Sequence, residues 1–139
     1  AQIRCGWAIV AARASGVPLF LSRPAGSSPE NRWGNNRIGP RGNDNFFHPE
    51  VVAANKFRQH MIGEKETLYY SADGKVMEVA RGKKGAALIN LGEADDISIK
   101  TCLPDGSYTD AVHKASFTVQ KGVLKGHADG MSSYMLEVQ

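Results

Sequence analysis

Residues 17–21 (VPLFL) form an apolar run without alternating polar residues, which is typical of a strand covered on both faces in a parallel sheet. The preceding segment predicts a helix, because its apolar residues recur at spacings of three and four: Ile3, Trp7, Val10 and Ala14. Gly16 stands where a left-handed C-terminal cap is expected. A single strand cannot satisfy its own backbone hydrogen bonds, so the sequence predicts sheet partners outside this chain.

A long loop, residues 23–48, follows the predicted strand 17–22 and is rich in Gly, Pro, Asn and Arg. Loops of this length are uncommon in compact domains and are usually functional or disordered. A second helix is predicted from Pro49, with Glu50 complementing the helix dipole and His48 interpreted as a cap. Before Gly63 ends this helix, one face is expected to carry Val51, Ala54, Phe57, Arg58 and Met61.

Beyond Gly63 the pattern changes to short strands separated by turn signals, with GKKG (82–85) expected at a hairpin tip. The predicted strands are 67–71, 75–81, 86–91, 97–101, 103–112, 116–120, 121–126 and 133–139. Short strands at this spacing indicate an antiparallel sandwich or Greek key. We therefore expect residues 1–62 to be the last segment of a barrel or doubly wound domain, and residues 63–139 to be a β-sandwich.

The net charge of +3 raises the question of nucleic-acid binding, but the basic residues are scattered except for Arg23, Arg32, Arg37 and Arg41. That loop also holds acidic residues, so no nucleic-acid partner is expected. No apolar run approaches the length of a membrane span, and no membrane partner is expected.

The cysteines and histidines predict no metal site in this chain. Cys5 and Cys102 lie far apart, with no second cysteine near either, which excludes a zinc ribbon. Two buried free thiols are favoured over a disulfide, which stays open as an alternative. The remaining histidines show no ligand spacing: His60, His113 and His127.

Four stretches together resemble the C-terminal portion of secreted α-amylases of glycoside hydrolase family 13, most closely the bacterial saccharifying type similar to that of Bacillus subtilis. These are IRCGWAIVAARASGVPLFLSRPAG, IGPRGNDNFFHPEVVAANKFRQHMIG, LPDGSYTD and GMSSYMLEVQ. The resemblance covers essentially the whole chain. It implies the end of a catalytic (β/α)₈ barrel in the order helix, strand, loop, helix, followed by an all-β antiparallel Greek-key sandwich called domain C.

The resemblance also implies a retaining glycosidase that hydrolyses internal α-1,4-glucosidic bonds of starch and related glucans. In that family three carboxylates act at the ends of the fourth, fifth and seventh barrel strands, all of which would lie upstream of Ala1. No position here matches those motifs or the family's calcium ligands. We therefore expect no catalytic residue and no cofactor in this chain, calcium in the missing N-terminal part, inactivity of the chain alone, and secretion of the parent enzyme.

The loop after the predicted strand supplies the candidate substrate-binding residues, because active sites of such barrels lie in the loops that follow the strands. Trp33 is expected to stack on a glucose ring. Side chains expected to hydrogen-bond sugar hydroxyls are Arg23, Arg32, Asn35, Asn36 and Arg37. The alternative is that Trp33 packs on the barrel rim and the arginines are solvated or paired with Glu30 and Asp44.

Two functions stay open at this point. The first is the C-terminal part of an α-amylase, whose partners are the missing part of the barrel and an α-glucan. The second is a β-sandwich module that stabilises a partner domain or binds polysaccharide without chemistry. Residues 1–62 in isolation are expected to associate with another copy or with the missing segment of the barrel. The apolar patch expected to be exposed there is made of Ile3, Trp7, Val17, Leu19, Phe20, Leu21, Val51 and Phe57.

Overall fold

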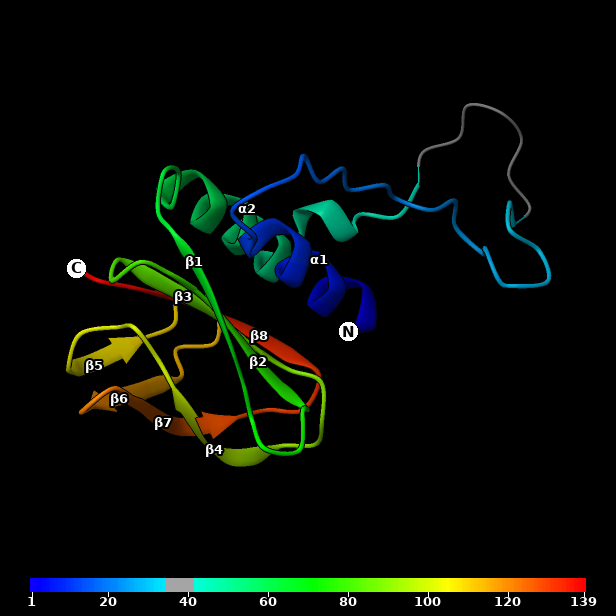
Figure 1. Cartoon of the computed structure of the whole chain (residues 1–139). Coiled ribbons are helices and arrows are strands. Elements are labelled where there is room, and N and C mark those ends of the chain that lie inside the picture. Colours follow the sequence, from blue (N-terminus) through cyan, green and yellow to red (C-terminus); the bar gives the residue numbers. More distant parts are fainter. Residues whose placement is uncertain (35–41) are drawn as a thin grey trace.

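A computed structural model describes residues 1–34 and 42–139 of the chain (Figure 1). The helical elements are α1 (Gln2–Ala12), the 3₁₀ helix η1 (Asn45–Phe47) and α2 (Pro49–His60). The strands are β1 (Glu66–Tyr70), β2 (Val76–Arg81), β3 (Gly85–Asn90), β4 (Asp95–Lys100), β5 (Gly106–Thr109), β6 (Ser116–Gln120), β7 (Val123–Ala128) and β8 (Ser132–Glu137). Each strand overlaps a predicted one, so the β-rich second half is confirmed.

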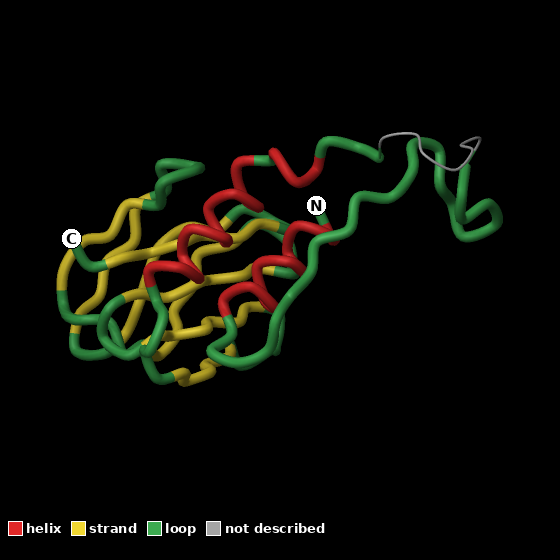
Figure 2. The backbone as a smooth tube through the Cα atoms, turned by 90° about the horizontal axis from the view of Figure 1, so that it is seen from above, coloured by secondary structure: helices red, strands yellow, loops and turns green. Residues whose placement is uncertain are grey.

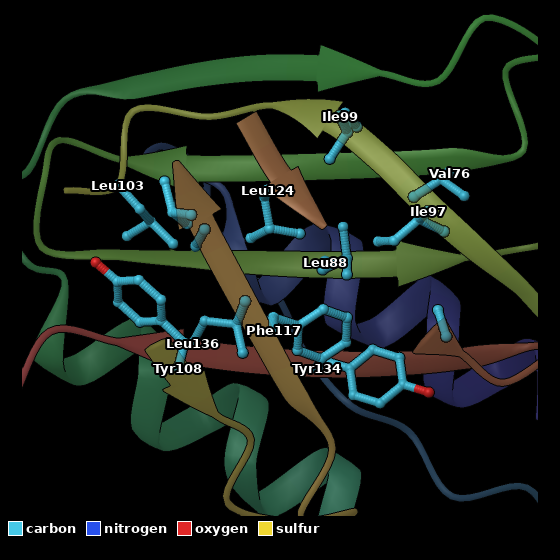
Figure 3. Close-up of a cluster of buried hydrophobic side chains, with 13 residues drawn as sticks. Val76, Leu88, Ile97, Ile99, Leu103, Tyr108, Phe117, Leu124, Tyr134 and Leu136 are labelled. Atoms are coloured by element: carbon cyan, nitrogen blue, oxygen red, sulfur yellow. The ribbon is translucent and has the colours of Figure 1, made fainter. Parts of the chain in front are cut away.

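The strands form two antiparallel sheets, in the orders β1-β2-β3-β8 and β4-β7-β6-β5. In β4 and β6, buried and exposed residues alternate, which places one side of each strand against the other sheet. The buried side chains of both sheets meet in one cluster, which includes Leu88, Phe117 and Tyr134 (Figure 3). The second half is therefore a two-layered core of antiparallel sheets.

Helices α1 and α2 cover the outer face of the sheet β1-β2-β3-β8, as Figures 1 and 2 show. A second buried cluster lies between them and includes Ala8, Phe57, Ala87 and Met135. Strand β3 is buried along its whole length, because one of its faces meets the opposite sheet and the other meets the helices. The domain boundary near Gly63 stays a prediction.

Helix α2 begins and faces the core as predicted. Pro49 occupies its first turn, and Nδ1 of His48 accepts a hydrogen bond from the backbone N of Glu50 at 3.3 Å. Val51 and Phe57 are buried, and Phe57 packs in one cluster with the sheet residues Val79 and Ala87. Both were expected in the apolar patch of residues 1–62 taken alone; in the whole chain they are covered, so they add nothing to its exposed surface.

Helix α1 buries a different face from the one predicted. Its buried side chains are small: Cys5, Ala8, Ala11 and Ala12. Ile3 and Val10, from the predicted stripe, are exposed. Small side chains allow α1 to approach α2 and β3 closely, which explains the difference. The helix ends at Ala12 with Arg13 as its C-cap, so Gly16, although its φ is +85°, lies beyond the cap.

The strand predicted at residues 17–22 is not formed. The segment is neither helix nor strand, and Val17, Leu19 and Leu21 are each more than 80% exposed. A strand exists only through pairing with a neighbour, and no described residue pairs with this segment. Val17, Leu19 and Leu21 therefore lie uncovered on the surface, while Phe20 is half-buried.

The cysteines are free, as favoured from their spacing. Cys5 is buried, whereas Cys102 is only half-buried and its Sγ lies 3.0 Å from the hydroxyl of Tyr69. Among the described residues, no helix has the length and apolar character needed to cross a membrane.

Candidate functional site

The described first part of the loop predicted to contact a sugar, residues 23–34, projects from the body of the molecule (Figures 1 and 2). Its base is closed by an antiparallel bridge between Pro24 and Gly42 and by a hydrogen bond of 3.1 Å from the Asn43 backbone N to the Arg23 carbonyl. A Cβ atom at Gly42 would lie 2.9 Å from the carbonyl oxygens of Ser22 and Arg23, so this closure needs glycine. The bridge thus fixes the point at which the loop leaves the molecule.

A turn around residues 28–34 presents Trp33 to solvent. The backbone N of Ser28 donates to the Asn31 carbonyl at 2.9 Å, and the Asn31 side-chain amide donates to the Gly34 carbonyl at 2.9 Å. Gly34 has a φ of +59°, which glycine adopts without strain. Trp33 is 74% exposed, so its ring is accessible to a ligand. An exposed indole offers the flat apolar surface that the predicted stacking requires.

The other predicted contact residues are only partly described. Arg23 and Arg32 are exposed. Asn35, Asn36 and Arg37 lie outside the described residues. The exposure of Arg23, Arg32 and Trp33 means that other described residues do not enclose them. The structure therefore places Arg23, Arg32 and Trp33 on one loop, and the part of the chain that it describes forms no closed site around them.

An apolar surface lies beside the start of this loop, and we call it the α1 face. Its residues are Ile3, Trp7, Val10, Pro18, Leu19, Phe20 and Leu21, which line a hollow of about 390 Å³. The rings of Trp7 and Phe20 meet edge to face with centroids 5.1 Å apart. The Trp7 indole N–H donates to the Asn55 side chain at 2.9 Å. Uncovered apolar surface of this kind is typical of contact with another protein segment.

Glu78 is the acidic residue whose environment most resembles that of a catalytic acid. Burial raises its pKa to about 7, and a hydrogen bond of 2.7 Å from the Thr101 hydroxyl to Oε1 partly offsets that effect. Its Oε2 has no partner among the described residues. A catalytic acid must reach its substrate, however, and the Glu78 side chain is fully buried in the core. Its position therefore argues against a role in the chemistry.

Glu50 joins three elements in a second buried polar cluster. Its side chain is 5% exposed and accepts a hydrogen bond from Arg4 Nε of α1 at 2.6 Å. His113, between β5 and β6, places Nε2 at 3.1 Å from Glu50 Oε1. The His113 ring also meets Tyr134 edge to face at 5.1 Å. These contacts satisfy the carboxylate from opposite sides, which makes Glu50 a structural link between the helices and the second sheet.

A metal site is not apparent in the described part of the chain, where no three His, Cys, Asp or Glu side chains are arranged to hold an ion. Sequence reasoning also missed the polar contacts that organise the structure. The sequence signal for them is that Glu78 and Arg81 are charged residues inside the otherwise apolar strand β2. Glu50 was interpreted only as a helix-dipole residue.

Comparison with known proteins gives the family context of this arrangement. No family model matches the chain. An α-amylase of Butyrivibrio fibrisolvens is 39% identical over 133 residues, and one of Clostridium acetobutylicum is 36% identical over 126 residues; each alignment covers 90% of this chain. The relatives of this chain are α-amylases. The chain spans only 14% and 15% of their respective lengths, so it corresponds to a small part of them.

Solved α-amylase structures share the fold. The α-amylase I of Eisenia fetida in complex with maltohexaose matches 98% of this chain and 35% of its own, with a TM-score of 0.67 and 16% identity. An Anoxybacillus α-amylase matches 99% of this chain and 32% of its own, with a TM-score of 0.57 and 15% identity. The antiparallel sheets with two helices thus match a C-terminal β domain of an amylase. Similarity to the Bacillus subtilis enzyme in particular stays a prediction.

Proposed function

We propose that this chain is the C-terminal part of a secreted α-amylase that hydrolyses internal α-1,4-glucosidic bonds of starch and related glucans with retention. The observation that carries the proposal is the alignment of 90% of the chain with two α-amylases. The catalytic carboxylates and the calcium ion are proposed to belong to the rest of the enzyme. On this proposal the 139-residue chain is inactive alone.

Residues 1–62 are proposed to complete a (β/α)₈ barrel, and residues 63–139 to form a Greek-key domain C. The uncovered side chains of Val17, Leu19 and Leu21 support the first part, because a barrel strand is covered on both faces. The sheet order β4-β7-β6-β5 supports the second, since β5, β6 and β7 follow one another and β4 lies beside β7. Residues 17–22 would then gain ladder partners from the rest of the barrel.

The loop that begins at Arg23 is proposed to face the substrate. Loops after barrel strands form the active sites of this architecture. The exposed Trp33 would stack on a glucose ring. Hydroxyl groups of the sugar would receive hydrogen bonds from Arg23, Arg32, Asn35, Asn36 and Arg37.

The test is a chimera in which this chain replaces the aligned segment of the Butyrivibrio fibrisolvens α-amylase. Hydrolysis of soluble starch is compared for the chimera, the same enzyme without the segment, and this chain alone. We expect activity only in the chimera. A folded but inactive chimera would overturn the proposed function, and hydrolysis by the chain alone would refute the absence of catalytic residues.

The substrate loop is tested in the same chimera by Trp33→Ala, with the exposed Phe47 as the matched site for a Phe47→Ala control. Loss of a stacked ring is expected to raise KM for starch about three- to tenfold and to leave kcat within twofold. Equal KM values for the two variants would remove Trp33 from the proposed site.

The alternative function, a module that binds polysaccharide without chemistry, predicts a different result. In that case the chain alone is retained on insoluble starch, and the chimera shows no gain in hydrolysis over the truncated enzyme. A pull-down of the chain on starch granules, with soluble maltoheptaose as competitor, separates this outcome from that of an amylase segment.

A further inference from the structure

Two arginines from distant parts of the sequence hold the backbone that leaves α1. Arg58 of α2 donates through Nη1 to the carbonyl oxygens of Ala11 at 3.1 Å and Arg13 at 2.9 Å, and through Nη2 to that of Gly16. One guanidinium group therefore binds three carbonyls within residues 11–16. Beyond Ala12 this backbone is not helical, so these carbonyls depend on partners from outside the segment.

Arg81 of β2 holds the same region from the side of the sheet. It is only 3% exposed, and its Nη1 donates to the Ala12 carbonyl at 2.9 Å. Its Nη2 donates to the carbonyls of Met61 at 2.8 Å and Glu64 at 3.1 Å. The buried guanidinium thus meets carbonyls at the C-terminal ends of both helices, where the helix dipole favours a positive charge.

A third contact ties the segment to the first strand of the sheet. Arg13 Nε lies 2.8 Å from both carboxylate oxygens of Glu66 in β1, and the backbone N of Ala14 donates to Glu66 Oε2 at 2.7 Å. The side chains of Arg58, Arg81 and Glu66 therefore surround residues 11–16. Immediately downstream, Val17, Leu19 and Leu21 are exposed, so the course of residues 17–22 depends on where this anchored backbone ends.

We propose that Arg58 and Arg81 are positioning residues through which the β-sandwich and α2 set the direction of residues 17–22 and of the loop that begins at Arg23. Planar guanidinium groups suit this role, because one group reaches several carbonyl oxygens in fixed geometry, whereas a lysine ammonium acts as a single point charge. The consequence for glucan binding rests on the proposed function. The contacts of Arg58 and Arg81 with residues 11–16 are independent of that function.

The first measurement is limited trypsin digestion of this chain, with mass spectrometry of the cleavage after Arg13. Arg58→Lys and Arg81→Lys each keep a positive charge and a trypsin site but lose the multiple carbonyl contacts. We expect cleavage after Arg13 to be about tenfold faster in each variant, because loss of one or two hydrogen bonds raises the local opening constant by about that factor. Arg4→Lys is the matched control, since Arg4 bonds Glu50 and not residues 11–16.

The second measurement places the same variants in the chimera and determines KM and kcat on starch. Misdirection of the loop is expected to raise KM severalfold for Arg58→Lys and Arg81→Lys, with kcat within twofold and Arg4→Lys unchanged. Arg58 is only half-buried, so its variant remains informative if Arg81→Lys fails to fold. Unchanged cleavage after Arg13 in folded Arg58→Lys would overturn the inference.

The two arms separate failure of the inference from failure of the proposed function. A chimera that carries the unsubstituted chain and lacks activity contradicts the function, while the digestion still decides whether the arginines anchor residues 11–16. Faster cleavage with unchanged KM in an active chimera would overturn the role of the arginines in glucan binding.

Discussion

Glu78 makes the stability of the chain depend on pH in a direction opposite to that of an ordinary surface carboxylate. Burial raises its pKa from 4.5 to about 7, so the folded state binds this proton more tightly than the unfolded state. The contribution of protonated Glu78 to the free energy of unfolding is therefore complete below pH 4.5. It is lost as the pH rises through about 7.

Near Glu78, the titratable side chains Tyr69 and Cys102 lie beside each other, and their contact and burial raise the pKa of Tyr69 to about 12.

Glu78→Gln is expected to remove this pH dependence. Between pH 4.5 and 7 the free energy of unfolding of the unsubstituted chain should fall by about 3 kcal/mol more than that of Glu78→Gln. Chemical denaturation at a series of pH values measures the difference. Glu93→Gln changes an exposed glutamate and serves as the control. Parallel stability curves for Glu78→Gln and the unsubstituted chain would contradict the prediction.

At the scale of elements, prediction from sequence succeeded where the partner of an element lies within the chain. Buried and exposed residues alternate in β4 and β6 because one side of each strand faces the opposite sheet, and Ala54 and Phe57 of α2 meet a sheet of the same chain. The strand predicted at residues 17–22 is not formed, because no described residue pairs with this segment. In α1 the large apolar residues suggested the wrong face, since close packing selected Ala8 and its small neighbours.

The candidate site shows the same limit. The loop follows from its local composition and turn residues, but the exposure of Trp33 does not, because packing of Trp33 on a barrel rim stayed open from the sequence. The contacts that direct the loop join Arg81 to Ala12 and Arg58 to Gly16, which lie far apart in the sequence. Local periodicity carries no information about such pairs, so the anchor was not predictable from one sequence.

Strand β7 provides a prediction at the same scale. A Cβ atom at Gly126 would lie 2.5 Å from the Phe117 ring, which is itself packed against Tyr134. Gly126→Ala should therefore lower the free energy of unfolding by about 1–3 kcal/mol through overpacking. Gly6→Ala is the matched control in α1, where nothing lies within 4 Å, and it should raise stability by about 0.5–1 kcal/mol. Thermal denaturation of both variants tests this, and equal effects at the two sites would contradict it.

At the scale of the whole molecule, the sheet β1-β2-β3-β8 separates two buried clusters, one inside the sandwich and one under the helices. The helical layer is covered on its sheet side and uncovered on the α1 face. In the proposed enzyme the rest of the barrel covers that face. A chain that lacks this cover has only solvent or another copy of itself to contact.

We therefore expect the isolated chain to self-associate through the α1 face and to bind a hydrophobic dye. Replacing Leu19 and Leu21, which are 81% and 83% exposed, by glutamate should shift the chain to monomer, because charges resist burial in an apolar contact. Leu91→Glu, at an exposed position on the sandwich, is the control and should leave association unchanged. Light scattering coupled to size exclusion measures the mass. A monomeric, dye-free unsubstituted chain would show that the α1 face needs no cover.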